Sequence, residues 1–90
     1  MPRYLVERTY PDHFDIPLSD EGVERCRVII ANDTLEHVTW LCSYVTTDRR
    51  KTICVCDAPT PEAVRRAAQR NGQPIDRITE VRVFAPYFTV

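Results

Sequence analysis

The stretch from residue 38 to residue 57 constrains the fold most strongly, because it holds two strand-like segments joined by a short polar link. Val38–Val45 is rich in β-branched and aromatic residues, and Lys51–Asp57 has the same character. The five residues between them, Thr46–Arg50, are polar and suit a hairpin loop. The two segments are therefore predicted to pair as neighbouring antiparallel strands.

A helix is predicted on each side of this hairpin in the sequence. The first spans about Asp20 to Asn32, because apolar residues recur there at helical spacing, at Val23, Cys26, Ile29 and Ile30. Ser19 and Asp20 are residue types that commonly cap the start of a helix. We therefore expect the loop of residues 9–18, which contains two prolines, to lead into this helix.

The second predicted helix has clear start and stop signals. Thr60 is a capping type, and Pro61 stands at the first helical position, where its missing N–H costs nothing. Val64 and Ala67 belong to its apolar stripe, and Gly72 suits a left-handed residue at its end. These signals predict a helix that begins after Thr60 and ends before Gly72.

Two further strands complete the pattern, at Tyr4–Arg8 and Ile78–Phe84. The order is then strand, helix, strand, strand, helix, strand, which is the ferredoxin-like βαββαβ arrangement of the α+β class. Right-handed crossovers put both helices on one face of a four-stranded antiparallel sheet. Ninety residues fit one such domain, so residues 1–90 are predicted to be a single ferredoxin-like domain.

Strand alternation divides the predicted sheet into two unlike faces. The aliphatic set is expected to pack beneath the helices, and it comprises Leu5, Leu41, Ser43, Val45, Ile53, Val55, Val81 and Val83. The larger, aromatic and partly polar set is expected on the open face, and it comprises Tyr4, Val6, Arg8, Trp40, Cys42, Tyr44, Thr52, Cys54, Cys56, Glu80, Arg82 and Phe84.

The open face is too apolar to face water alone, which predicts that a second copy of the chain covers it. Two such sheets would enclose a cavity as well as an interface. The candidate ligand-binding residues of that cavity are Arg8, Trp40, Cys42, Tyr44, Cys54, Cys56, Glu80 and Arg82. A homodimer interface without a ligand, and a monomer with an exposed face, are the alternatives.

Composition and charge exclude some classes of function. The chain has 12 basic and 13 acidic side chains, and this balance argues against a protein that binds nucleic acid by neutralising phosphates. No apolar run approaches the roughly 20 residues that a membrane span needs, and charges interrupt the first eight residues before any signal peptide could form. The chain is therefore expected to be cytoplasmic, with its four cysteines reduced.

Three of those cysteines are candidate metal ligands. Cys54 and Cys56 share one face of a strand, and a hairpin centred near Asp48 would bring Cys42 opposite them. Three neighbouring thiols suit a soft or borderline metal. The alternative is that these cysteines pack as small hydrophobic residues.

The two histidines are further candidate ligands for nickel or another divalent metal. His13 stands between Asp12 and Asp15, and His37 follows Glu36. Each site combines an imidazole with a carboxylate, a donor set that nickel or zinc accepts. Most such surface groupings bind nothing, and both readings stay open.

No catalytic constellation is visible in the sequence. Ser43 has no evident histidine partner, and with two glycines the chain has no glycine-rich phosphate loop. An acid–base role for Glu80 or Tyr44 in a closed cavity is an alternative. The enzyme hypothesis is then a small oxygenase or isomerase that holds an apolar substrate between two sheets.

Several segments together resemble a known bacterial family of domains of unknown function. They are Tyr4–Arg8, Val38–Val45, Lys51–Cys54, Asp57–Pro59 and Pro74–Val81. The family includes a nickel-responsive, nickel-binding protein from actinobacteria. The resemblance implies a ferredoxin-like fold, a homodimer and a nickel site.

The same resemblance sets this chain apart at two positions. Family members often have histidine at the position of Cys42 and tyrosine at the position of Cys56. If that histidine binds the metal, Cys42 replaces it with a softer ligand or the site is lost. The resemblance therefore implies nickel as the cofactor without a ligand set for this chain.

Overall fold

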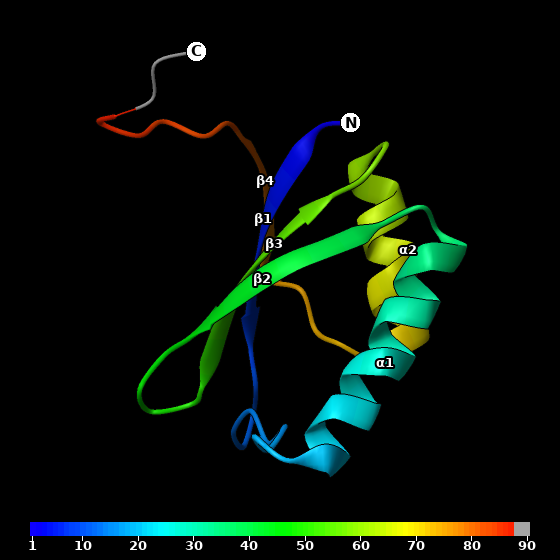
Figure 1. Ribbon diagram of the computed structural model, residues 1–90, viewed down its shortest axis with the longest axis vertical. Helices are drawn as coiled ribbons and strands as arrows, with labels where there is room; N and C mark the ends of the chain where they lie inside the picture. Colours follow the sequence, from blue (N-terminus) through cyan, green and yellow to red (C-terminus); the bar gives the residue numbers. More distant parts are fainter. Residues whose placement is uncertain (88–90) are drawn as a thin grey trace.

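The computed structural model describes residues 1–87, and it has the expected βαββαβ order. Figure 1 shows the four strands as one layer and the two helices as a second layer. The elements are β1 (Arg3–Thr9), α1 (Asp20–Leu35), β2 (Thr39–Val45), β3 (Lys51–Asp57), α2 (Pro61–Asn71) and β4 (Arg77–Val81). The predicted ferredoxin-like α+β fold is confirmed.

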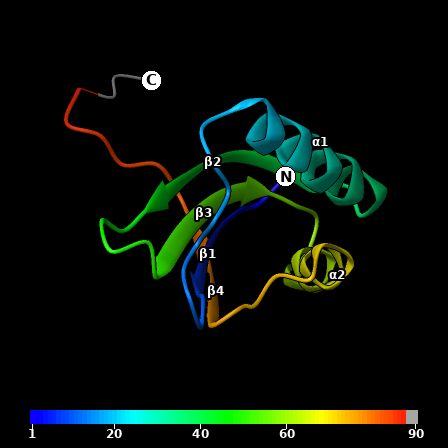
Figure 2. The ribbon, with the colours of Figure 1, turned by 90° about the horizontal axis from the view of Figure 1, so that it is seen from below.

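The sheet is antiparallel with the strand order β2-β3-β1-β4. Figure 2 shows α1 and α2 on the same side of the sheet, as two right-handed crossovers require. No helix of residues 1–87 covers the opposite face. The sheet therefore has one covered face and one open face, as the sequence predicts.

The ends of α2 follow the predicted signals. The Thr60 hydroxyl accepts a hydrogen bond from the Ala63 N–H at 3.1 Å, and Pro61 is the first helical residue. Gly72 ends the helix with a φ of 64°, in the left-handed region that favours glycine. Both ends of this helix are thus fixed by local chemistry.

The helix α1 extends to Leu35, three residues beyond the predicted end at Asn32. It stops where His37 takes a left-handed conformation, with a φ of 61°. Ser19 provides only its backbone carbonyl to the first turn, because its side chain makes no capping hydrogen bond. Helices commonly end at a left-handed glycine, but here the left-handed residue is a histidine. The end of α1 was therefore predicted too early.

Gly22 fits a close approach in the first turn of α1. A Cβ atom at this position would lie 1.7 Å from the backbone oxygen of Pro17. No side chain larger than hydrogen fits there without moving the backbone. Glycine has a low helix propensity and therefore destabilises α1. It is nevertheless needed at this position, because the loop of residues 9–18 packs directly against the first turn of the helix.

Strand β4 is shorter than predicted, because it ends at Val81 and not at Phe84. Its neighbour β1 begins at Arg3, and Arg3 pairs with Val81. Residues beyond Val81 have no strand beside them on that edge, so the ladder stops there.

The side chains that share a face were grouped largely correctly, but the two faces were assigned to the wrong sides. Tyr4, Val6 and Cys56 are almost completely buried, and they pack against Ala63, Val64 and Ala67 of α2. Arg8 and Thr52 are also buried on this helix-covered face. The predicted aliphatic layer, Leu5, Ile53, Val55 and Val81, instead lies on the open face.

A β-bulge at Leu41 breaks the predicted grouping of Trp40 with Cys42 and Tyr44 on one face of β2. Trp40 pairs with Cys56 and Cys42 pairs with Val55, so two steps along β2 match one step along β3. Ser43 then pairs with Cys54 on the covered face, while Cys42 and Tyr44 lie on the open face. The bulge therefore separates Cys42 from the other two thiols.

None of the helices in the described part of the chain, residues 1–87, combines the length and the apolar character needed to span a bilayer.

Candidate binding cavity

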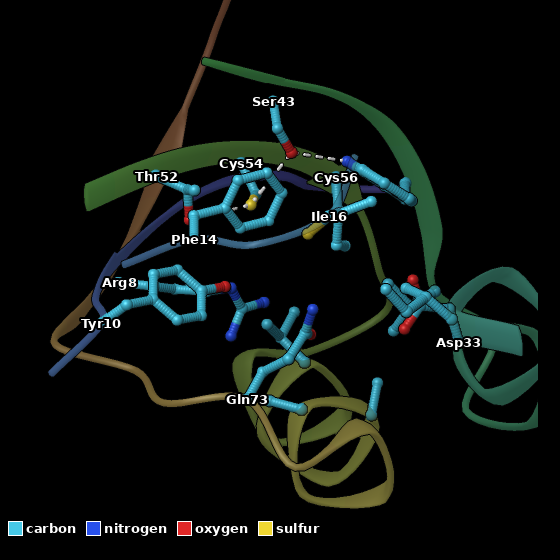
Figure 3. A pocket seen from close by; sticks show the side chains of 16 residues that line it. Arg8, Tyr10, Phe14, Ile16, Asp33, Ser43, Thr52, Cys54, Cys56 and Gln73 are labelled. Atoms are coloured by element: carbon cyan, nitrogen blue, oxygen red, sulfur yellow. Dashed lines mark hydrogen bonds between the residues drawn. The ribbon is translucent and has the colours of Figure 1, made fainter. Parts of the chain in front are cut away.

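A cavity of about 40 Å³ lies between the covered face of the sheet and the two helices (Figure 3). This volume exceeds the roughly 10–15 Å³ that one water molecule needs. The lining residues come from every element except β4, and from the loop before α1. This cavity lies inside a single chain, whereas the cavity predicted between two sheets stays a prediction.

The roof of the cavity is a row of hydrogen-bonded side chains on β2 and β3. Trp40 Nε1 donates to Ser43 Oγ at 2.8 Å, and Ser43 Oγ donates to Cys54 Sγ at 3.1 Å. The Cys54 thiol in turn lies 3.8 Å from Thr52 Oγ1. Because these polar atoms form hydrogen bonds with one another, they hold the roof rigid. They are therefore not the groups that would bind a ligand.

Arg8 is the buried cation of the cavity. Its side chain is only 7% exposed, and its guanidinium points inward from β1 in Figure 3. Nη1 donates to the backbone oxygen of Pro74 at 2.8 Å. Nε has no hydrogen-bond partner. Among residues 1–87 it is the one buried side-chain nitrogen or oxygen without such a partner. A buried donor without a partner lowers the stability of the folded state. An acceptor group bound next to Nε would remove this cost.

Asp33 is the anionic side chain of the cavity and comes from α1. It is 7% exposed, and its Oδ1 accepts a hydrogen bond from Asn71 Nδ2 of α2 at 3.0 Å. Burial raises the pKa of Asp33, and the hydrogen bond from Asn71 and the charge of Arg8 offset part of this effect. None of the ion pairs among residues 1–87 joins Asp33 to Arg8.

Two further titratable groups line the cavity in their neutral forms. Burial, reinforced by the negative charge of Asp33, raises the pKa of the Cys56 thiol to about 11. Burial also raises the pKa of Tyr10. Because a metal binds the thiolate, a thiol this hard to deprotonate is a poor metal ligand at neutral pH.

The loop before α1 closes one end of the cavity and is held by the β2–β3 hairpin. Arg49 Nε donates to the backbone oxygen of Phe14 at 2.9 Å, and its guanidinium lies 5.5 Å from the centre of the Phe14 ring. The ring of Phe14 in turn packs against Tyr10 at a centroid distance of 5.6 Å. The tip of the hairpin thus positions the rings of Phe14 and Tyr10, which form part of the cavity wall and lie far from the hairpin in sequence.

The structure brings together four of the eight predicted cavity residues. Arg8, Trp40, Cys54 and Cys56 line the cavity. Cys42 and Tyr44 are exposed on the open face. Glu80 and Arg82 instead line a shallow surface groove beside the N-terminus of the chain.

The predicted metal ligands do not converge within one chain. Among residues 1–87, no three histidine, cysteine or carboxylate side chains are placed so that they could hold a metal ion together. Of the residues near His37, Glu36 is bound by Arg66 and Arg70, and Asp33 faces the cavity. The donors of a single chain therefore do not fit a nickel site.

Sequence reasoning missed Asp33, Tyr10, Phe14 and Gln73 as cavity residues. A signal for Asp33 was present, because it stands four residues after Ile29 and seven after Cys26, on the apolar stripe of α1. A carboxylate that continues an apolar stripe is buried with it. No comparable pattern points to Tyr10, Phe14 or Gln73, which the loops bring in.

A ferredoxin-like domain with a cavity between sheet and helices is the class of protein that this fold and site define. The sequence model of the family described as nickel-responsive protein, SCO4226-like, matches residues 4–81. The chain belongs to this family, as the resemblance indicated.

A solved structure of a related protein supports the fold. The crystal structure of SCO4226 from Streptomyces coelicolor A3(2) superposes with a TM-score of 0.72 at 23% sequence identity. The match covers 92% of this chain and 99% of that chain. Among the curated proteins, none matches this chain.

Proposed function

We propose that the protein is a nickel-binding homodimer, in which two copies meet through the open faces of their sheets. The family description supplies the response to nickel. The observation that supports the proposed dimer is the uncovered, apolar open face of the sheet. Its centre holds Leu5, Ile53 and Val55 in neighbouring strands, with no element of residues 1–87 to cover them.

The charges on the open face also suit contact with a second copy. Arg3 Nε lies 2.8 Å from Asp57 Oδ1, and these two residues are paired across β1 and β3. Glu7 and Arg77 lie opposite each other in the backbone register of β1 and β4. An apolar centre beside charges that have partners of opposite sign is the composition of a protein–protein interface.

Nickel would be held between the copies, because one chain does not gather enough donors. Cys42 is the exposed thiol on the open face, in the same row of side chains as Val55 and Leu5. In a twofold interface each residue occurs twice, so a Cys42 close to the axis brings two thiols together. Thiolates are ligands that nickel accepts.

The dimer is tested by light scattering of the tag-free protein after gel filtration. We expect the mass of two chains for the wild type and of one chain for Val55→Glu, which places a charge in the centre of the face. Circular dichroism of Val55→Glu checks that the variant is folded. A monomeric wild type contradicts the proposal.

Nickel binding is tested by calorimetric titration of the same proteins. Cys42→Ser is expected to weaken nickel binding, whereas Cys26→Ser, a matched change on α1, leaves it unaltered. The monomeric Val55→Glu variant loses the site as well. Equal nickel binding by Cys42→Ser and the wild type removes Cys42 from the proposal, and no binding by the wild type ends it.

The alternative function, a small-molecule-binding enzyme, depended on a cavity at the open face. The cavity that one chain forms lies beneath the helices, and its lining includes no histidine. Its two thiols are Cys54, which accepts a hydrogen bond from Ser43, and Cys56, which stays protonated at neutral pH. The geometry therefore supports binding better than it supports catalysis.

A further inference from the structure

We infer that the cavity between the sheet and the helices is a binding site for a small carboxylate with a short apolar tail, held by Arg8. This site is separate from the open face. Its occupation requires neither nickel nor a second copy of the chain.

The free edge of Arg8 points to a carboxylate. An arginine binds a carboxylate best through two parallel N–H groups, and the edge formed by Nε and Nη2 offers such a pair. Here Nη1 is occupied by the Pro74 carbonyl, and Nε is buried without a partner. The donor that lacks an acceptor is thus part of the edge that a carboxylate would use.

The other walls point to an apolar tail of limited length. Ile29 of α1, Val64 of α2 and Val38 line the cavity, together with Phe14 and Ile16 of the preceding loop. Its volume of about 40 Å³ holds a few non-hydrogen atoms. A ligand of the size of acetate or propionate fits this space, and longer chains require movement of a wall.

The wall that is free to move is α1. Of its 16 residues only Gly22 and Asp33 are buried, and Val23, Val28, Ile30 and Leu35 are each at least half exposed. Few apolar contacts thus hold this helix against the sheet, which lowers the cost of opening the site.

Asp33 couples carboxylate binding to pH. It accepts a hydrogen bond from Asn71 of α2 and shares the cavity with Arg8 of β1, Cys56 of β3 and Tyr10 of the loop, and among these only Arg8 carries a charge at neutral pH. A second carboxylate in the cavity repels an ionised Asp33. Since burial already raises the pKa of Asp33, proton uptake by this group relieves the repulsion, and binding strengthens as the pH falls.

The test is a titration of the ¹⁵N-labelled full chain with acetate, propionate, butyrate and hexanoate, followed by amide NMR in the presence of a chelator. We expect saturable shifts at cavity residues, with the affinity reaching its maximum at a short chain. Inorganic phosphate is the control ligand, because it carries charge without a tail. Equal binding of phosphate and propionate overturns the inference.

Variants assign the site to Arg8. Arg8→Met is expected to weaken propionate binding about tenfold or more, the usual effect of losing a hydrogen bond to a charged group. Arg65→Met, an exposed arginine on α2, is the matched control and leaves the affinity unchanged. An unchanged affinity in Arg8→Met overturns the inference.

Two further variants keep the test decisive if Arg8→Met does not fold. Ala68→Leu adds bulk to the cavity while Arg8 itself is retained, and it is expected to abolish binding. Asp33→Asn removes the competing charge, so it should tighten binding at neutral pH and flatten the pH dependence. Unchanged propionate binding by Ala68→Leu places the ligand elsewhere and overturns the inference.

Discussion

The two helices cover the same face of the sheet but are held there in different ways. In the 11 residues of α2, Ala63, Val64, Ala67 and Ala68 form a continuous buried stripe. In the 16 residues of α1, the buried positions are a glycine and an aspartate. The first arrangement stabilises the fold, whereas the second leaves a cavity with a carboxylate in its wall. The comparison indicates that α2 supplies stability and that α1 forms the loosely held wall of the site.

The largest expected effect is the contrast between two matched valine substitutions. Val64 of α2 is 2% exposed and Val23 of α1 is 50% exposed. Val64→Ala should lower the free energy of unfolding by about 2–3 kcal/mol, because two buried methyl groups are lost and the cavity grows. Val23→Ala should change it by less than about 0.5 kcal/mol. Urea unfolding of both variants measures the difference, and equal losses would contradict the division of roles.

The next effect concerns Cys56, which lies in the same buried cluster as the α2 stripe. Its pKa is about 11 in the folded chain, against an ordinary value of 9.0. Between these two pH values the unfolded chain loses the proton first, so the folded state loses stability as the pH rises. The loss is about 1–2 kcal/mol once the pH exceeds 10.

Cys56→Val provides the control for this alkaline limb. The variant keeps an apolar side chain of similar size but has no proton to lose. Unfolding curves at pH 8 and pH 10 should therefore separate the wild type from the variant by their pH dependence. If both proteins lose the same stability over this interval, Cys56 is not the group responsible.

A smaller effect is expected at the two helix starts. The Thr60 side chain caps α2, whereas the Ser19 side chain makes no capping bond to α1. Thr60→Ala should cost about 1 kcal/mol, and Ser19→Ala should cost a few tenths at most. Thermal unfolding of the two variants compares them directly. A cost at Ser19 equal to that at Thr60 would show that α1 is anchored as firmly as α2.

Local chemistry explains which parts of this structure were predictable from the sequence. Thr60, Pro61 and Gly72 each act within a few residues, so both ends of α2 followed from the sequence. The Lys51–Asp57 strand also has its predicted bounds. By contrast, α1 ends before a histidine in a left-handed conformation, and the conformational preferences of histidine do not predict this.

The site was less predictable, because two of its determinants are not local. The Leu41 bulge puts Cys42 on the opposite face from Trp40, Cys54 and Cys56, with which it was grouped, and this shift is visible only in the pairing with β3. The covered face was misjudged because aliphatic side chains were taken as the mark of a helix-covered layer. Here the small residues of α2 accommodate Tyr4 beneath them, so large side chains fill the covered layer and aliphatic ones the open face.

The smallest effect concerns the link that holds the C-terminal end of α1 to α2. The carboxylate of Glu36 accepts hydrogen bonds from Arg66 Nε at 2.7 Å and from Arg70 Nε at 2.8 Å, and the first of these is the main reason that its pKa is lowered. A lowered pKa means that the folded state favours the ionised form. The stability from this link is therefore complete above the ordinary glutamate value of 4.5, and it is lost as the pH falls through the lowered native pKa.

Glu36→Gln should accordingly be slightly less stable than the wild type at neutral pH, and the two proteins should converge in acid. Both arginines are about half exposed, so salt screens the interaction and the difference should shrink when sodium chloride is added. Urea unfolding at neutral and acid pH, with and without salt, measures these changes. A difference that persists in acid would mean that Glu36 supports α1 by packing and not by charge, and the loose attachment of this helix would then need another explanation.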